Sequence, residues 1–216
     1  MGTVPAALVT ELREQAHLRR AVETGTFRGD GTAILSELFP EVVTIELSRE
    51  LHKLALARFA HRGNIRLIRG ESGAELPTVV DCTVPTFYFL DAHWSGGETA
   101  GEEHECPLLA ELGALGAGHW DDCIVIDDAR LFRDPPPPPH KPTHWPTFAE
   151  VAGVIRAAHP DHYVSVAGDQ IIAVPSMARP SVDAWAAVVG GPGAESLRAS
   201  IRHFARRLMR RRLSGR

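Results

Sequence analysis

Three aspartates lie where two apolar runs of the sequence end. Asp91 closes the run "FYFLD", and Asp127 and Asp128 close the run "IVIDD". If the two runs are neighbouring parallel strands, their carboxyl ends bring these side chains to one edge of a sheet. Crowded carboxylates attract a hard divalent cation such as Mg²⁺, which could bind substrate oxygens and lower the pKa of a hydroxyl. An alternative is that Asp127 caps the next turn while Asp91 contacts a ligand directly.

A histidine stands two residues beyond the first of these aspartates. The usual pKa of histidine, near ~6.5, makes His93 the best general base in this part of the chain. We therefore predict His93 and Asp91 as the catalytic residues, with Asp91, Asp127 and Asp128 as metal ligands. The alternative for His93 is a hydrogen bond to a ligand or to the fold.

The stretch "AVETGTFRGDGT" has the composition of a ligand-binding turn. Glu23 ends a short apolar run, and Gly25 and Gly29 then allow the backbone to approach a ligand closely before a helix begins. The GxGxxG pattern that cradles a pyrophosphate is absent. An acidic residue at this position suits a ligand that carries an ammonium and a sulfonium group, so Glu23, Gly25, Thr26 and Gly29 are predicted ligand contacts.

The elements that position these residues form an alternating series. Strand patterns cover 20–24, 42–46, 65–69, 86–91 and 123–127, and helical patterns cover 30–39, 49–61, 72–80, 106–117 and 147–158. Alternation of this kind predicts an α/β fold, a Rossmann-like doubly wound sheet of seven mostly parallel strands with helices on both faces. The runs "HYVSVA" and "QIIAVP", joined by Gly168-Asp169, predict a C-terminal antiparallel hairpin.

This layout resembles class I methyltransferases, which use S-adenosylmethionine (SAM), more than the six-stranded fold of dehydrogenases. Glu46 ends the second strand, 23 residues after Glu23, where a carboxylate can accept hydrogen bonds from both ribose hydroxyls. Leu47 follows it, and the third strand leads into "RGESG", which places Glu71 and Ser72 beside the adenine. For Glu46 alone, the alternative is a solvated surface charge. Asp91 and His93 complete the predicted cofactor contacts.

The order of motifs over residues 18–175 resembles a more specific group. "FLDAHW" followed by "IVIDDA" is similar to the metal-dependent O-methyltransferases typified by catechol O-methyltransferase, and to macrocin-type sugar O-methyltransferases. The resemblance implies SAM and Mg²⁺ as cofactors. The chain departs from the catechol enzymes at three places: Ala92 is an extra residue, Ser95 begins a segment where those enzymes have a lysine base, and Asp128 replaces an asparagine.

Two irregular segments follow predicted strand ends. Residues 95–105 are glycine-rich and acidic, and residues 132–146 contain five consecutive prolines, which favour a stiff extended chain. We predict that both are active-site loops and that Trp94, His104, His144 and Trp145 contact the substrate, with Trp145 stacking on a ring. A zinc site from His104, Cys106, His140 and His144 is an alternative, although the spacing matches no standard zinc pattern.

The sequence divides into a methyltransferase domain over 1–178 and a C-terminal linker with a basic amphipathic helix over 179–216. Residues 195–216 hold eight arginines against one glutamate, although the net charge of the whole chain is −4. This tail could contact an anionic membrane or RNA, or pack on its own domain or on another subunit of a homo-oligomer. The acidic remainder argues against a dedicated nucleic-acid binder.

Composition sets the broad class. An apolar fraction of 44% and a charged fraction of 23% are typical of globular proteins, and no apolar run reaches the length of a membrane span. Three cysteines without CxxC spacing fit a reducing cytoplasm, and the N-terminal segment predicts a helix rather than a signal peptide.

Together these features predict a SAM-dependent O-methyltransferase, assisted by Mg²⁺, that acts on a small hydroxylated molecule such as a sugar or natural product. The alternatives are a metal-free methyltransferase acting on another acceptor, and a non-catalytic SAM-fold module tethered by its arginine-rich tail.

Overall fold

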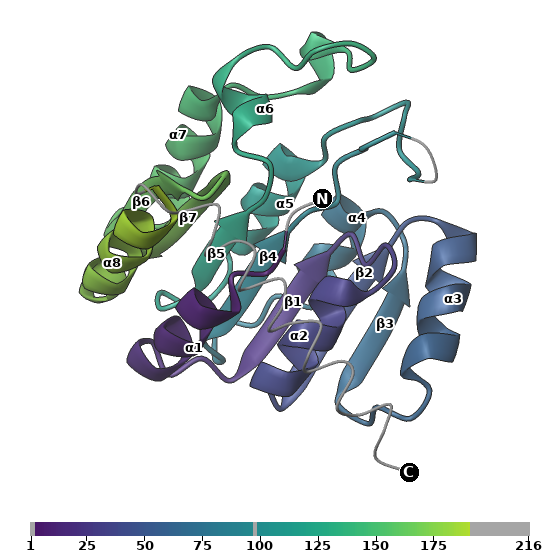
Figure 1. The fold of residues 1–216 in the computed structure, drawn as a ribbon, viewed down its shortest axis with the longest axis horizontal. Helices are drawn as coiled ribbons and strands as arrows, with labels where there is room; N and C mark the ends of the chain where they lie inside the picture. Colours follow the sequence, from purple (N-terminus) through teal and green to yellow (C-terminus); the bar gives the residue numbers. More distant parts are fainter. Residues whose placement is uncertain (1–2, 97–98, 191–216) are drawn as a thin grey trace.

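A seven-stranded sheet forms the centre of the molecule (Figure 1). The computed structural model describes residues 3–96 and 99–190. The strand order is β3-β2-β1-β4-β5-β7-β6. Strands β1 to β5 pair in parallel, and β7 runs antiparallel to both β5 and β6. The predicted doubly wound sheet and its C-terminal hairpin are confirmed. The strands are β1 (Arg20–Thr24), β2 (Glu41–Glu46), β3 (Ile65–Arg69), β4 (Thr86–Leu90), β5 (Cys123–Ile126), β6 (His162–Ala167) and β7 (Gln170–Pro175).

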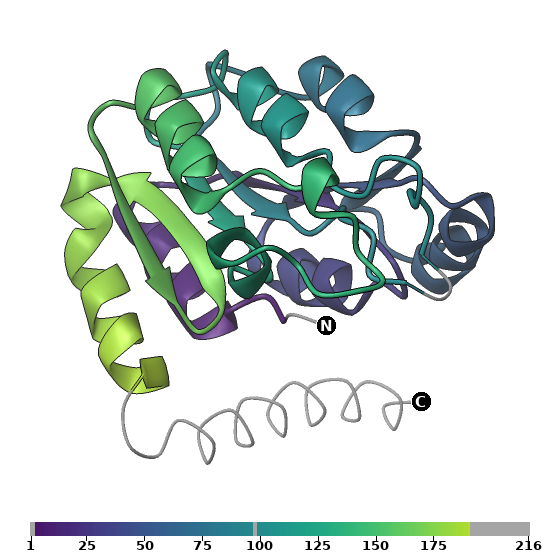
Figure 2. The same ribbon diagram turned by 90° about the horizontal axis from the view of Figure 1, so that it is seen from above.

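Helices cover both faces of the sheet (Figure 2). One hydrophobic core lies between the sheet and α1, α2 and α8, and a second lies between the sheet and α5 and α7. Every residue of β1, β4, β5 and β7 is buried, which explains why these strands appear in the sequence as continuous apolar runs. The helices are α1 (Ala6–Gln15), α2 (Asp30–Leu38), α3 (Arg49–Phe59), α4 (Ser72–Glu75), α5 (Leu108–Leu115), α6 (Arg130–Arg133), α7 (Phe148–Ala158) and α8 (Arg179–Gly190), with 3₁₀ turns η1 (Leu76–Thr78), η2 (Pro142–His144) and η3 (Ser176–Ala178).

Side-chain caps fix where several helices begin. Ser48 accepts a hydrogen bond from the backbone N–H of Leu51 at the start of α3. Thr147 and Glu150 form a reciprocal capping box at the start of α7. These contacts satisfy N–H groups that have no partner inside the helix, so they set the points at which loops at the carboxyl edge of the sheet become helices.

The structure differs from the sequence predictions at three segments. The helix expected over 72–80 divides into α4 and η1, with Pro77 inside the second turn. The helix expected from 106 begins at Leu108, because Pro107 occupies its N-cap. Residues 179–190, expected as a linker, form α8, whose buried Val182 and Val189 belong to the first core.

The arginine-rich segment 195–216 lies outside the described residues, so its predicted amphipathic helix stays a prediction. Cys82, Cys106 and Cys123 are free thiols. None of the helices in the described part of the chain combines the length and the apolar character needed to cross a bilayer.

Candidate active site

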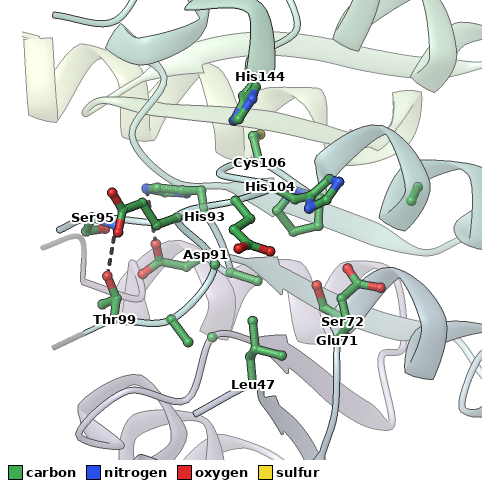
Figure 3. A pocket seen from close by; sticks show the side chains of 18 of the residues that line it. Leu47, Glu71, Ser72, Asp91, His93, Ser95, Thr99, His104, Cys106 and His144 are labelled. Atoms are coloured by element: carbon green, nitrogen blue, oxygen red, sulfur yellow. Dashed lines mark hydrogen bonds and ion pairs between the residues drawn. The ribbon is translucent and has the colours of Figure 1, made fainter. Parts of the chain in front are cut away.

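A cavity of about 940 Å³ opens at the carboxyl ends of the first five strands (Figure 3). Residues from the ends of β1, β2, β3, β4 and β5 line it, including Gly25, Glu46, Gly70, Asp91 and Asp128. In Figure 3 the His144 side chain lies across the cavity from Leu47. Ligands of open α/β sheets bind at this edge. The cavity therefore lies at the edge of the sheet where the sequence motifs predict the functional site.

The glycine turn after β1 forms the floor of the cavity beside β4. Gly25 has φ +80°, and a Cβ placed on it would lie 2.2 Å from the carbonyl oxygen of Asp91. Its N–H donates to the Ile45 carbonyl at 2.9 Å, and the Asp91 N–H donates to the Thr24 carbonyl at 3.1 Å. The tips of β1, β2 and β4 therefore approach so closely that only glycine fits at position 25.

Glu23, Thr26 and Gly29 do not line the cavity, although the sequence predicts them as ligand contacts. Glu23 is buried and accepts hydrogen bonds from the hydroxyls of Thr32 and, at 2.7 Å, Thr44. Burial raises the pKa of Glu23 to about 7. These residues support the turn from behind, because the first turn of α2 packs directly against the Glu23 carboxylate.

The predicted contacts after β2 and β3 do line the cavity: Glu46, Leu47, Glu71 and Ser72. The carboxylate of Glu46 accepts hydrogen bonds from the N–H of Phe27 at 2.7 Å and of Ser48 at 2.8 Å. Glu71 caps α4 by accepting from the N–H groups of Gly73 and Ala74. Phe27, with φ +46°, also lines the cavity, and sequence reasoning missed it because an aromatic residue inside a glycine turn has no established ligand pattern.

Asp91, His93 and Asp128 form one polar cluster at the tips of β4 and β5. Nε2 of His93 lies 2.9 Å from Oδ2 of Asp128 and 3.7 Å from Oδ1 of Asp91. Arg130 places Nη1 2.5 Å from Oδ1 of Asp128. The imidazole and the guanidinium therefore hold Asp128 from both sides.

The pKa values in this cluster move in different directions. Burial raises the pKa of Asp91 well above its usual range, His93 opposes that shift, and Asp127 adds to it. Burial alone would lower the pKa of His93, but the hydrogen bond to Asp128 and the charge of Asp91 raise it. Burial works against ionisation of Asp128 as well, yet His93 and Arg130 hold its pKa well below the usual range. The cluster thus stabilises one carboxylate and leaves the others poorly compensated.

The predicted magnesium ligands do not fit a preformed metal site. Within residues 3–96 and 99–190, no group of three His, Cys, Asp or Glu side chains is arranged to hold a metal ion. His93 and Arg130 already occupy both oxygens of Asp128. Asp127 is buried and does not line the cavity, and its Oδ2 has no hydrogen-bond partner among the described residues. The sequence argument overlooked Arg130, a cation only two residues beyond Asp128.

The predicted substrate residues are divided between the cavity and its surroundings. His104, His144 and Trp145 line the cavity, and the rings of His104 and His144 stack with centroids 6.4 Å apart. Trp94 does not line it and packs edge-on against His140 at 5.4 Å. His104, Cys106, His140 and His144 all lie in the described part of the chain, and no three of them are arranged to hold a zinc ion.

Comparison with known proteins supports the fold. No family model matches the chain. A 73-residue segment is 42% identical to a protein-L-isoaspartate O-methyltransferase of Nitrobacter winogradskyi, and the match covers 33% of each protein, so the chain aligns with only about a third of that relative.

Two solved structures share the architecture. The O-methyltransferase TomG from Streptomyces achromogenes, in complex with SAM, superposes with a TM-score of 0.51 and 21% identity over 81% of this chain and 82% of its own. An O-methyltransferase from Bacillus cereus in complex with SAH gives 0.55 and 17% over 80% and 81%. Together with the strand order and the cavity at the carboxyl edge, these matches show that the chain has the class I methyltransferase fold.

Proposed function

We propose that the protein is a SAM-dependent O-methyltransferase that acts on a small hydroxylated molecule, such as a sugar or a natural product. One observation carries the proposal. A single cavity of about 940 Å³ connects the glycine turn, Glu46 and Ser72 with His93, His144 and Trp145. Two reactants can therefore occupy one shared space with their reacting atoms side by side, which is the main requirement of a transfer reaction.

The half of the cavity formed by β1 to β3 suits SAM. Each oxygen of Glu46 accepts one backbone hydrogen bond and keeps a lone pair that can accept a ribose hydroxyl. Gly25 and Ser72 line this half of the cavity, and Ser72 would lie beside the adenine. The carboxylates of Glu46 and Asp91 favour a cofactor with a positively charged sulfonium.

The other half supplies the groups for acceptor chemistry. In the transfer, the S–CH₃ bond of the sulfonium breaks as a bond forms to the acceptor oxygen, and the hydroxyl proton must leave. Asp91 and His93 line the cavity and are the groups we assign to hold that proton. Asp128 orients the imidazole of His93 through the 2.9 Å contact. The chain thus contributes orientation and charge compensation more than covalent chemistry.

Magnesium assistance is a second proposal, and one observation favours it. Burial, followed by the nearby charge of Asp128, raises the pKa of Asp127, and no described residue donates a hydrogen bond to its Oδ2. A cation would relieve that penalty. Because the described arrangement does not fit a preformed site, we route no step through a metal. Methyl transfer that survives EDTA would remove this proposal and leave the first one standing.

Three further predictions stay proposals. A cytoplasmic location rests on the free cysteines. Contact of the arginine-rich tail with a membrane or RNA and assembly into a homo-oligomer rest on the sequence alone. The alternative of a non-catalytic SAM-fold module makes a different prediction. Such a protein would bind SAM but would form no SAH, whichever acceptor is added.

Calorimetric titration with SAM tests the proposed function. We expect binding by the wild type, and at least a tenfold loss of affinity in Glu46→Gln, about 1.4 kcal/mol, because one acceptor for a ribose hydroxyl becomes an amide. Glu50→Gln is the matched control, since Glu50 is exposed on α3 and does not line the cavity. Transfer of a radiolabelled methyl group to a panel of polyhydroxylated molecules then identifies the acceptor. Absence of SAM binding by the wild type would refute the proposal.

A further inference from the structure

Glu105 is a buried carboxylate that joins two loops at the cavity. Its side chain has 0% exposure, although its neighbours Glu102, Glu103 and His104 are exposed. A carboxylate in the interior is costly unless hydrogen-bond donors surround it. Its partners therefore show what this group does.

The hydrogen-bond donors to the Glu105 carboxylate come from the second active-site loop, residues 132–146. Oε2 accepts a hydrogen bond from Nε1 of Trp145 at 2.8 Å, and the backbone N–H of Lys141 lies 3.0 Å from Oε1 and 3.1 Å from Oε2. Nδ1 of His140 lies 3.2 Å from Oε2. One side chain thus fastens residues 140–145 to the segment that precedes α5.

The backbone of the same residue reaches a third segment. The carbonyl oxygen of Glu105 accepts a hydrogen bond from the N–H of Trp94 at 2.7 Å. Trp94 follows His93 directly, so residue 105 connects the segment after β4 with both loops. The Trp145 indole packs against the ring of His93, with centroids 5.3 Å apart and planes at 60°. A continuous series of contacts runs from Glu105 through Trp145 to His93.

We propose that Glu105 is a positioning residue that holds the two loops together and sets the Trp145 indole against His93. It thereby fixes the shape of the acceptor half of the cavity, whereas Gly25, Glu46 and Ser72 of the other half lie at the ends of β1 to β3. This inference rests on the proposed function, because the methyl transfer reaction is what assigns one half of the cavity to the acceptor. The contacts themselves do not depend on which molecule binds.

Two measurements report directly on the position of residues 140–145. In Glu105→Ala we expect hydrogen exchange at the Lys141 amide to accelerate at least tenfold, because its acceptor is gone. The fluorescence of Trp145, obtained as the difference between each protein and its Trp145→Phe derivative, should shift to longer wavelength as water reaches the indole. Glu105→Gln keeps the volume and one acceptor oxygen, so it should restore part of both signals. Glu103→Ala, an exposed change two residues away, should alter neither.

SAM titration separates this inference from the proposed function. If Glu105 positions only the acceptor half, the affinity of Glu105→Ala for SAM should stay within twofold of the wild type. Unchanged exchange and emission in Glu105→Ala would overturn the positioning role. Loss of SAM affinity in both Glu105→Ala and Glu105→Gln would overturn it too, since Glu105 would then support the whole cavity. A wild type that binds no SAM would remove the proposed function, while exchange and emission would still decide whether Glu105 joins the loops.

Discussion

The two ends of the central sheet bury carboxylates in opposite ways. At the amino end, Asp122 is fully buried and accepts hydrogen bonds from the N–H of Thr86 at 2.8 Å and of His119 at 2.9 Å. Its backbone carbonyl lies 2.7 Å from Nε2 of His162. At the carboxyl end, Oδ2 of Asp127 is also buried, but within residues 3–96 and 99–190 it has no hydrogen-bond partner.

The difference separates a carboxylate that holds the fold together from carboxylates whose burial is poorly compensated. Asp122 joins the start of β4 to the turn before β5, and it does not line the cavity. Burial raises the pKa of Asp91, Asp122 and Asp127, and that of Asp122 to about 7. Two backbone N–H groups compensate Asp122, whereas Asp127 accepts a hydrogen bond from the Gln170 side chain at 3.3 Å and its Oδ2 has no partner in the described part of the chain. A protein tolerates such a cost where the group serves a purpose other than stability. The comparison predicts that removing Asp122 at the amino end changes stability but not ligand binding, whereas changes in the residues that line the cavity at the carboxyl end change ligand binding as well.

The largest effect is expected at Gly25. In Gly25→Ala the new Cβ would lie 2.2 Å from the carbonyl oxygen of Asp91, so the tips of β1 and β4 must move apart. We expect a loss of about 3–4 kcal/mol in the free energy of unfolding and more than a tenfold loss of SAM affinity, measured by denaturant titration and calorimetry.

Gly96 provides the matched control for this change. It has φ +83°, close to the +80° of Gly25, but no atom of the described residues lies within 4 Å of its added Cβ. Gly96→Ala should therefore lower the free energy of unfolding by only about 1–2 kcal/mol, because the left-handed backbone conformation is the single source of strain. Equal effects at the two positions would mean that the close approach at Gly25 is unimportant.

Removal of the Asp122 carboxylate should produce the next largest effect. Asp122→Ala leaves the N–H groups of Thr86 and His119 buried without an acceptor, which costs about 3 kcal/mol in total. SAM affinity should stay within twofold, because none of these residues lines the cavity. Asp121→Ala, a half-buried neighbour, should cost less than about 0.5 kcal/mol. A marked loss of SAM affinity in Asp122→Ala would break the division between the two ends.

The histidines of the amino end make stability depend on pH. Burial, together with the nearby charge of His162, lowers the pKa of His159 to about 4. Between that value and the usual one near ~6.5, the unfolded chain binds a proton that the folded chain does not, so stability is lost as pH falls through this window. We expect a loss of about 2 kcal/mol between pH 6.5 and pH 4 that is smaller in His159→Gln, measured by denaturant titration at each pH. An equal loss of stability in the variant would mean that groups other than His159 cause the acid sensitivity.

Sequence patterns could predict the fold but only part of the site. Strand ends and glycine positions follow from local preferences, so the edge of the sheet and the contribution of Glu46, Ser72 and His93 to the cavity were predictable. The orientation of Glu23 was not, since it depends on how α2 packs over β1. The contacts of Glu105 join residues 36 and 40 positions apart across irregular loops, and no periodicity encodes them. The sequence shows Arg130 two residues after Asp128. Their ion pair, however, depends on the turn after β5, where Asp128 has φ +55°, and local sequence preferences do not predict that turn.

The smallest effect, and the sharpest test of the comparison, is expected at Asp127. Because its pKa is raised in the folded state, ionisation opposes folding, and this penalty grows as pH rises above the usual value of an aspartate. Asp127→Asn removes the charge and keeps the shape, so we expect the variant to be more stable than the wild type by about 0.5–1 kcal/mol at pH 8, and the gain to shrink towards pH 4. Denaturant titration at both pH values measures it. A variant that is less stable than the wild type at pH 8 would place Asp127 with Asp122, as a carboxylate that the fold needs, and the division between the two ends of the sheet would fail.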